Sequence, residues 1–61
     1  MNILLVVSDL ALGGAQQIVI NLANELVRQN HKVWIFDVQP EYRVKGMISK
    51  LDERVHLISK D

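Results

Sequence analysis

The sequence predicts an α/β fold, a three-stranded parallel sheet with the element order βαβαβ. Three observations predict it. Two apolar runs, 3–7 and 33–36, are apolar on both strand faces and too short for buried helices, which is typical of interior parallel strands. The segment between them has helical periodicity. A second helical pattern follows, and then a third short run, Val55–Ile58, that is apolar except for His56. Alternating strands and helices indicate a parallel sheet with crossover helices.

The first predicted strand, Ile3–Val7, is apolar at every position and ends at Ser8 and Asp9. Because successive side chains point to opposite faces, both faces of this strand are expected to be covered. A short loop then brings Gly13 and Gly14 to the start of the helical pattern. Asp9 is expected to form this loop or to cap the helix.

The first predicted helix begins at Gly14, where the apolar spacing changes to that of a helix face. The residues expected to face the core are Ala15, Ile18, Val19, Leu22, Ala23, Leu26 and Val27. Ile20 is the one apolar residue off this stripe. Asn30 is expected to end the helix in the left-handed conformation, which Asn tolerates.

The second predicted strand, Val33–Phe36, closes at Asp37, and Pro40 marks the following loop. A second helix is expected over Glu41–Leu51, where four apolar residues share helical spacing: Val44, Met47, Ile48 and Leu51. Gly46 lowers the helix propensity of this segment by about 1 kcal/mol relative to Ala. The third predicted strand is Val55–Ile58.

Right-handed crossovers place both helices on the same face of such a sheet. Residues expected on the opposite face are nevertheless apolar: Leu4, Val6, Trp34 and Phe36. We therefore expect residues 1–61 to be part of a larger domain, or to associate with a partner through the uncovered face. Area scaling predicts that the chain is only marginally stable, because the roughly 90 kcal/mol gained by burying apolar surface is about equal to the entropic cost of ordering the chain.

Composition excludes several classes of function. Seven basic and seven acidic residues cancel and are dispersed, so no nucleic-acid footprint and no polybasic membrane patch is present. The first residues lack a secretory leader pattern, and no segment has the roughly 20 apolar residues of a membrane helix. The lack of cysteine fits a reducing compartment but fits others too, and a cytoplasmic location is the default expectation.

The Gly13–Gly14 turn is the candidate site. A strand, a glycine turn and a helix N-terminus together present backbone N–H groups to anions in open α/β sheets. Neither the dinucleotide fingerprint nor the P-loop is matched, because Ala15 and Ile18 stand where glycines would be needed and no lysine precedes Lys32. Contact with a ligand and a merely structural turn are both open interpretations.

Few other residues suggest chemistry. Asp37 stands where nicotinamide enzymes keep a ribose-binding acid, but a solvated carboxylate at a strand end is the expected role without the fingerprint. His31 and His56 are expected to be a helix-terminal residue and a strand residue without chemistry. No set of residues suited to catalysis or metal binding can be assembled, so neither is predicted.

Four segments together resemble the start of the group 1 (family 4) glycosyltransferases. They are Asn2-Ile-Leu-Leu-Val-Val-Ser, Leu12-Gly-Gly-Ala-Gln, Asn21-Leu-Ala-Asn-Glu-Leu and His31-Lys-Val. The resemblance is strong through Phe36 and only in outline afterwards. Gln16 stands where the family usually has glutamate, and Asn30 stands where it has glycine.

The resemblance implies a Rossmann-like fragment, the start of the N-terminal domain of a two-domain GT-B enzyme. Such enzymes transfer a sugar from a nucleotide-activated donor to an acceptor hydroxyl without a metal. Gly13 and Gly14 would then line the interdomain cleft, near the donor diphosphate and the acceptor. Most donor contacts come from the C-terminal half of the family's enzymes, so residues 1–61 alone are expected to be inactive.

Two other hypotheses remain. In one, the chain is a non-catalytic half-Rossmann module that associates with itself or a partner through the uncovered sheet face. In the other, it is half of a nicotinamide-binding domain. The sequence leaves open the donor sugar, the acceptor, the stereochemical outcome and any docking on a membrane surface.

Overall fold

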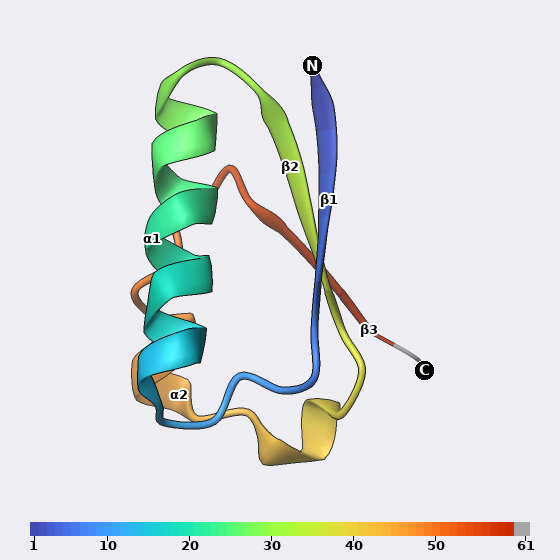
Figure 1. Ribbon diagram of the computed structural model, residues 1–61, viewed down its shortest axis with the longest axis vertical. Coiled ribbons are helices and arrows are strands. Elements are labelled where there is room, and N and C mark those ends of the chain that lie inside the picture. The colour runs from blue at the N-terminus through green and yellow to red at the C-terminus, as the bar shows by residue number, and fades with distance from the viewer. Residues whose placement is uncertain (60–61) are drawn as a thin grey trace.

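A computed structural model describes residues 1–59 of the chain. Three strands and three helical segments follow one another along it (Figure 1). They are β1 (Asn2–Val7), α1 (Gly14–Arg28), β2 (Lys32–Asp37), the 3-10 helix η1 (Pro40–Tyr42), α2 (Lys45–Ile48) and β3 (His56–Ser59). The predicted strands and the first helix are confirmed, with boundaries shifted by one residue or less at each strand end.

The three strands form one parallel sheet in the order β1-β2-β3. In its register, Leu4 pairs with Trp34, which pairs with His56. The crossover from β1 to β2 contains α1, as in a Rossmann-like fragment, so the predicted fold class is confirmed. Because all strands run the same way, their carboxyl ends share one edge, and the N-terminus of α1 lies at that end (Figure 1).

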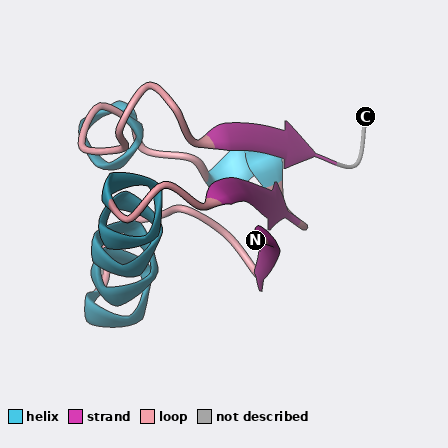
Figure 2. Cartoon of the chain, turned by 90° about the horizontal axis from the view of Figure 1, so that it is seen from above, coloured by secondary structure: helices cyan, strands magenta, loops and turns pink. Residues whose placement is uncertain are grey.

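Both α-helices lie on the same side of the sheet (Figure 2). The buried core forms between these helices and the facing side of the strands. Its members are Val7, Leu10, Ile20, Ala23, Val27, Val33, Ile35, Met47 and Val55. Asn30 has φ 69°, so the helix stops in the left-handed conformation that the sequence predicts.

The buried face of α1 differs from the predicted stripe. Ile20, the residue judged to be off the stripe, is fully buried, whereas Ile18 and Leu22 are 68% and 46% exposed and Ala15 is exposed as well. The physical reason is a rotation of the helix, whose core-facing line runs through Ile20, Ala23 and Val27. Ile18 and Leu22 therefore lie toward the solvent, while Val19 and Leu26 still pack against the edge of the core.

The prediction of one helix over Glu41–Leu51 is wrong. Arg43 and Val44 are extended, with ψ angles of 138° and 125°, and they separate η1 from α2. The Arg43 side chain reaches back to the Asp37 carboxylate, and the Val44 N–H donates to the Leu10 carbonyl at 3.1 Å. Arg43 and Val44 therefore bond to earlier parts of the chain and do not form the hydrogen bonds of a continuous helix.

The side of the sheet away from the helices is open. Leu4 and Val6 are 56% and 65% exposed, Ile58 is exposed too, and Trp34 and Phe36 are half-buried. The expected lack of cover is confirmed for this side. The total exposed area, 4132 Å², is close to the roughly 4,000 Å² expected for a compact chain of this mass. Within residues 1–59, no helix has the length and apolar character needed to cross a bilayer.

Candidate functional site

The candidate site lies at the carboxyl edge of the sheet, where the loop after β1 leads into α1. In open α/β sheets, ligands bind outside the carboxyl ends of the strands. Leu10 anchors this loop, because its side chain is fully buried while its carbonyl accepts from the Val44 N–H. The following residues, 12–15, are exposed. The loop is thus fixed at its start and open at the glycines.

Neither glycine of the turn is required by the backbone conformation. Gly13 precedes the helix with φ 168° and ψ 160°, an extended conformation open to other residues. Gly14 is the first helical residue, and a Cβ added there would meet no heavy atom within 4 Å. A Cβ on Gly13 would meet only the flexible side-chain amide of Gln16. A tight corner therefore does not explain the two glycines.

The N-terminus of α1 lacks a side-chain cap. The first helical bond runs from the Gln17 N–H to the Gly13 carbonyl at 3.1 Å, so the N–H groups of the residues before Gln17 point out of the helix end. The aligned peptide dipoles add a partial positive charge there. With two residues that lack Cβ beside it, this end allows close approach of an anionic or hydroxyl-bearing group.

Asp9 and Gln16 frame the other side of the turn. The Asp9 Oδ1 atom accepts from the Ala11 N–H at 3.1 Å and from Gln16 Nε2 at 2.9 Å. The loop-forming role expected of Asp9 is confirmed, and the helix-capping role is not. Beside the pair is a shallow hollow of about 160 Å³, lined by Val6, Val7, Ser8, Asp9, Ala15, Gln16 and Val19. Polar oxygens and the helix end thus border one small concavity.

The interpretation of Asp37 as a solvated carboxylate is wrong. Its side chain is fully buried at the end of β2. Its Oδ2 accepts from Arg43 Nε at 2.6 Å, and its Oδ1 accepts from the Gln39 N–H at 3.2 Å. Both oxygens are engaged inside the chain, so Asp37 fixes the loop after β2. Arg43 was missed by sequence reasoning, since its place beside Asp37 depends on the break between η1 and α2.

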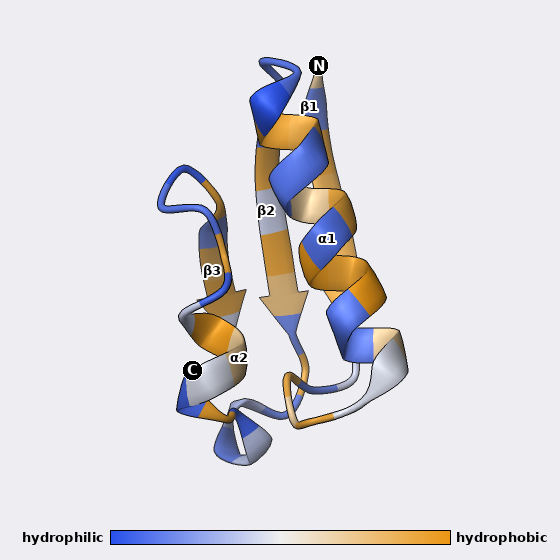
Figure 3. Ribbon diagram, turned by 90° about the vertical axis from the view of Figure 1, so that its left-hand side faces the viewer, coloured by the Kyte–Doolittle hydropathy of each residue, from blue (hydrophilic) through white to orange (hydrophobic). Residues whose placement is uncertain are grey.

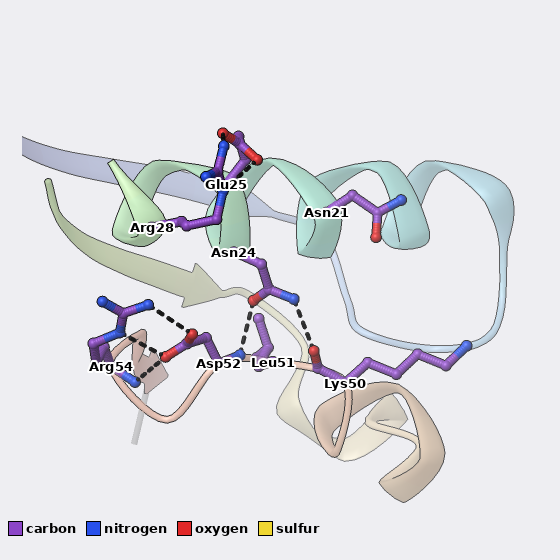
Figure 4. Close-up of a pocket in the computed structure, with 8 residues that line it drawn as sticks. All are labelled: Asn21, Asn24, Glu25, Arg28, Lys50, Leu51, Asp52 and Arg54. Carbon is purple, nitrogen blue, oxygen red and sulfur yellow. Dashed lines mark hydrogen bonds and ion pairs between the residues drawn. The ribbon is translucent and has the colours of Figure 1, made fainter. Parts of the chain in front are cut away.

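A second groove lies between α1 and the segment after α2, away from the glycine turn (Figure 4). Asn24 crosses it, donating to the Lys50 carbonyl at 2.8 Å and accepting from the Asp52 N–H at 2.8 Å. Figure 4 shows these two bonds and the ion pair of Asp52 with Arg54. The polar groups here bind one another, so we assign the groove a structural role.

The two histidines lie at the amino edge of the sheet, away from the turn. His56 stacks on Trp34 with ring centroids 5.5 Å apart. The His31 Nδ1 atom is buried without a hydrogen-bond partner. In the part of the chain that the structure describes, no three His, Cys, Asp or Glu side chains gather as metal ligands would. Comparison with family models, curated proteins and solved structures finds no match.

Proposed function

We propose that residues 1–61 are the amino-terminal part of a glycosyltransferase. The intact enzyme would transfer a sugar from a nucleotide-activated donor to an acceptor hydroxyl, and Gly13 and Gly14 would line its cleft. The resemblance of the sequence to group 1 (family 4) glycosyltransferases suggests the reaction. The Rossmann-like topology of β1, α1 and β2 is compatible with the start of a GT-B domain.

The observation that carries the proposal is the open space at Gly14. An exposed glycine at the first position of a helix, with ordinary φ and nothing near its missing Cβ, has no role in packing. Its small size does suit close approach of another molecule to the helix end. A donor diphosphate placed there is stabilised by N–H groups and by the helix dipole.

The Asp9–Gln16 pair is suited to hydrogen-bond the uncharged sugar part of a substrate. Carboxylate oxygens accept hydrogen bonds from sugar hydroxyls, and the bond from Gln16 orients the Asp9 carboxylate. We assign no catalytic residue to this chain. The groups that grip the donor are expected in the C-terminal half of the enzyme, so residues 1–61 bind weakly and do not catalyse transfer.

A second candidate is a non-catalytic module that associates through its open sheet face. The exposure of Leu4, Val6 and Ile58 on one face favours it. The nicotinamide-binding alternative has less support, because both Asp37 oxygens are engaged by Arg43 and Gln39 and are unsuited to accept ribose hydroxyls.

Titration of the ¹⁵N-labelled chain with uridine diphosphate tests the proposal, with uridine as the uncharged control. We expect the diphosphate to shift the amide resonances of residues 13–16 at millimolar concentration, and uridine to leave them unchanged. Equal shifts with both probes, or shifts only at the amino edge near His31 and Lys32, would contradict a diphosphate at the glycine turn.

A further inference from the structure

The side chain of Gln16, in the first turn of α1, bends back over the glycine turn. A Cβ added to Gly13 would collide with Gln16 Oε1, and the Gln16 Cδ atom lies 3.3 Å from the same point. In the other direction, Gln16 Nε2 donates to Asp9 Oδ1 at 2.9 Å. The amide group therefore extends from Asp9 to Gly13, and a group bound at the helix end lies beside it.

The Asp9–Gln16 pair carries a single negative charge. Asp9 supplies it, and Gln16 is neutral. The first turn of α1 contains no acidic residue. Among residues 1–59, the ion pairs with arginine involve other carboxylates, those of Glu25, Asp37 and Asp52. Figure 3 shows the start of α1 beside the loop that follows β1, which contains Asp9. The charge on Asp9 is therefore the one that a ligand at this turn meets.

A glutamate at position 16 would change this balance in two ways. Two carboxylates would face each other where the bond between Gln16 Nε2 and Asp9 Oδ1 now lies, and both would repel an anion. A carboxylate in the first turn would also be attracted by the helix dipole, and it would compete with a bound anion for the free N–H groups of the helix end. The neutral amide does neither.

We propose that Gln16 is a specificity-determining residue, which lets the glycine turn accept a phosphate group beside the Asp9 carboxylate. The inference rests on the proposed function, because it concerns the same ligand. Asp9 supplies one carboxylate for the hydroxyls of a sugar, while the N–H groups near Gly14 remain free for the diphosphate. With a second carboxylate in place of Gln16, the turn would favour an uncharged ligand over a diphosphate.

Titration of the ¹⁵N-labelled chain and its variants with uridine diphosphate, followed at the amides of residues 13–16, tests the proposal. Gln16→Glu is expected to weaken binding about tenfold at neutral pH and low salt, because the added charge repels each charge of the diphosphate. The difference should shrink in about 1 M salt, which screens the repulsion. Gln17→Glu is the control, because it adds the same charge beside Lys50, which hydrogen-bonds to Gln17, and it should leave the affinity unchanged.

Exchanging the two side-chain groups separates the effect of charge from that of shape. The double variant with Asp9→Asn and Gln16→Glu keeps one carboxylate and one amide, so it should regain most of the affinity that Gln16→Glu loses. Equal affinities of the unsubstituted chain and Gln16→Glu would overturn the proposal, as would a double variant that binds no better than Gln16→Glu. If uridine diphosphate shifts none of these amides in the unsubstituted chain, the proposed function fails, and this proposal fails with it.

Discussion

Arg43 and Asp37 form an ion pair that closes the loop after β2, with Arg43 Nε 2.6 Å from Asp37 Oδ2. The Asp37 side chain is fully buried, and the Arg43 side chain is 30% exposed. Removing the arginine would leave a buried carboxylate without its charged partner. The pair also explains why Arg43 is extended instead of helical.

Arg43→Met is expected to lower the free energy of unfolding by about 3 kcal/mol, near the lower end for breaking a buried pair, because Arg43 is partly exposed. Urea unfolding followed by circular dichroism measures this. Arg54→Gln, which breaks an exposed pair instead, should have much less effect. Equal effects of the two substitutions would show that burial of Asp37 does not govern the loop.

Ile20→Ala is expected to lower the free energy of unfolding by about 2–5 kcal/mol, because it opens a cavity in the core. Ile18→Ala, two residues away and 68% exposed, should change it by only about 0.5 kcal/mol. Thermal or urea unfolding of both variants measures the two changes in the free energy of unfolding. A larger effect at Ile18 would mean that α1 is rotated toward the face that the sequence pattern favours.

Asn24→Ala is expected to lower the free energy of unfolding by about 1–2 kcal/mol, because it removes two hydrogen bonds to the backbone of Lys50 and Asp52. The loss should be accompanied by faster hydrogen exchange at the Asp52 amide, which donates to Asn24. Asn21→Ala is the control, because the Asn21 side chain accepts from Gln17 on the same exposed surface of α1 and does not bridge to the segment after α2 within residues 1–59. An unchanged exchange rate at the Asp52 amide would argue against the hydrogen bonds that join Asn24 to the segment after α2.

Hydrogen bonds from Arg54 lower the pKa of Asp52 from 3.8 to about 2. The larger effect comes from the Arg54 side chain, and the smaller one comes from its backbone N–H. A lowered folded-state pKa stabilises the fold above about pH 4, and this contribution is lost as the pH falls toward 2. Arg54→Gln should raise the pKa of Asp52 toward 3.8 and reduce that pH dependence, while the backbone N–H of residue 54 still donates to Asp52. Carboxyl ¹³C titration measures the pKa, and Arg28→Gln is a control that should leave it unchanged.

The fold could be predicted because its signals are local. Apolar runs of four and five residues, the helical spacing after Gly14 and the stop at Asn30 each depend on neighbouring residues. The face of α1 could not be chosen reliably, because its apolar residues cover two adjoining surfaces. One packs on the sheet through Ile20, and the other, which includes Leu22, stays exposed.

The candidate site was located by sequence only in part. The position of Gly13 and Gly14 at the carboxyl edge follows from the strand and helix boundaries. The burial of Asp37 does not, because it depends on Arg43 six residues later adopting an extended conformation. The bond between Asp9 and Gln16 is likewise visible only once the loop is folded.

Transfer activity of the proposed intact glycosyltransferase, with Gly14→Ala introduced, tests the central claim most directly. A Cβ at Gly14 meets nothing within 4 Å, so the fold should be retained and its melting temperature should not fall. If the turn contacts the substrates, kcat/KM for sugar transfer should fall about tenfold or more, because a small displacement of reacting groups is costly. An unchanged kcat/KM would contradict a ligand-facing role for the glycine turn.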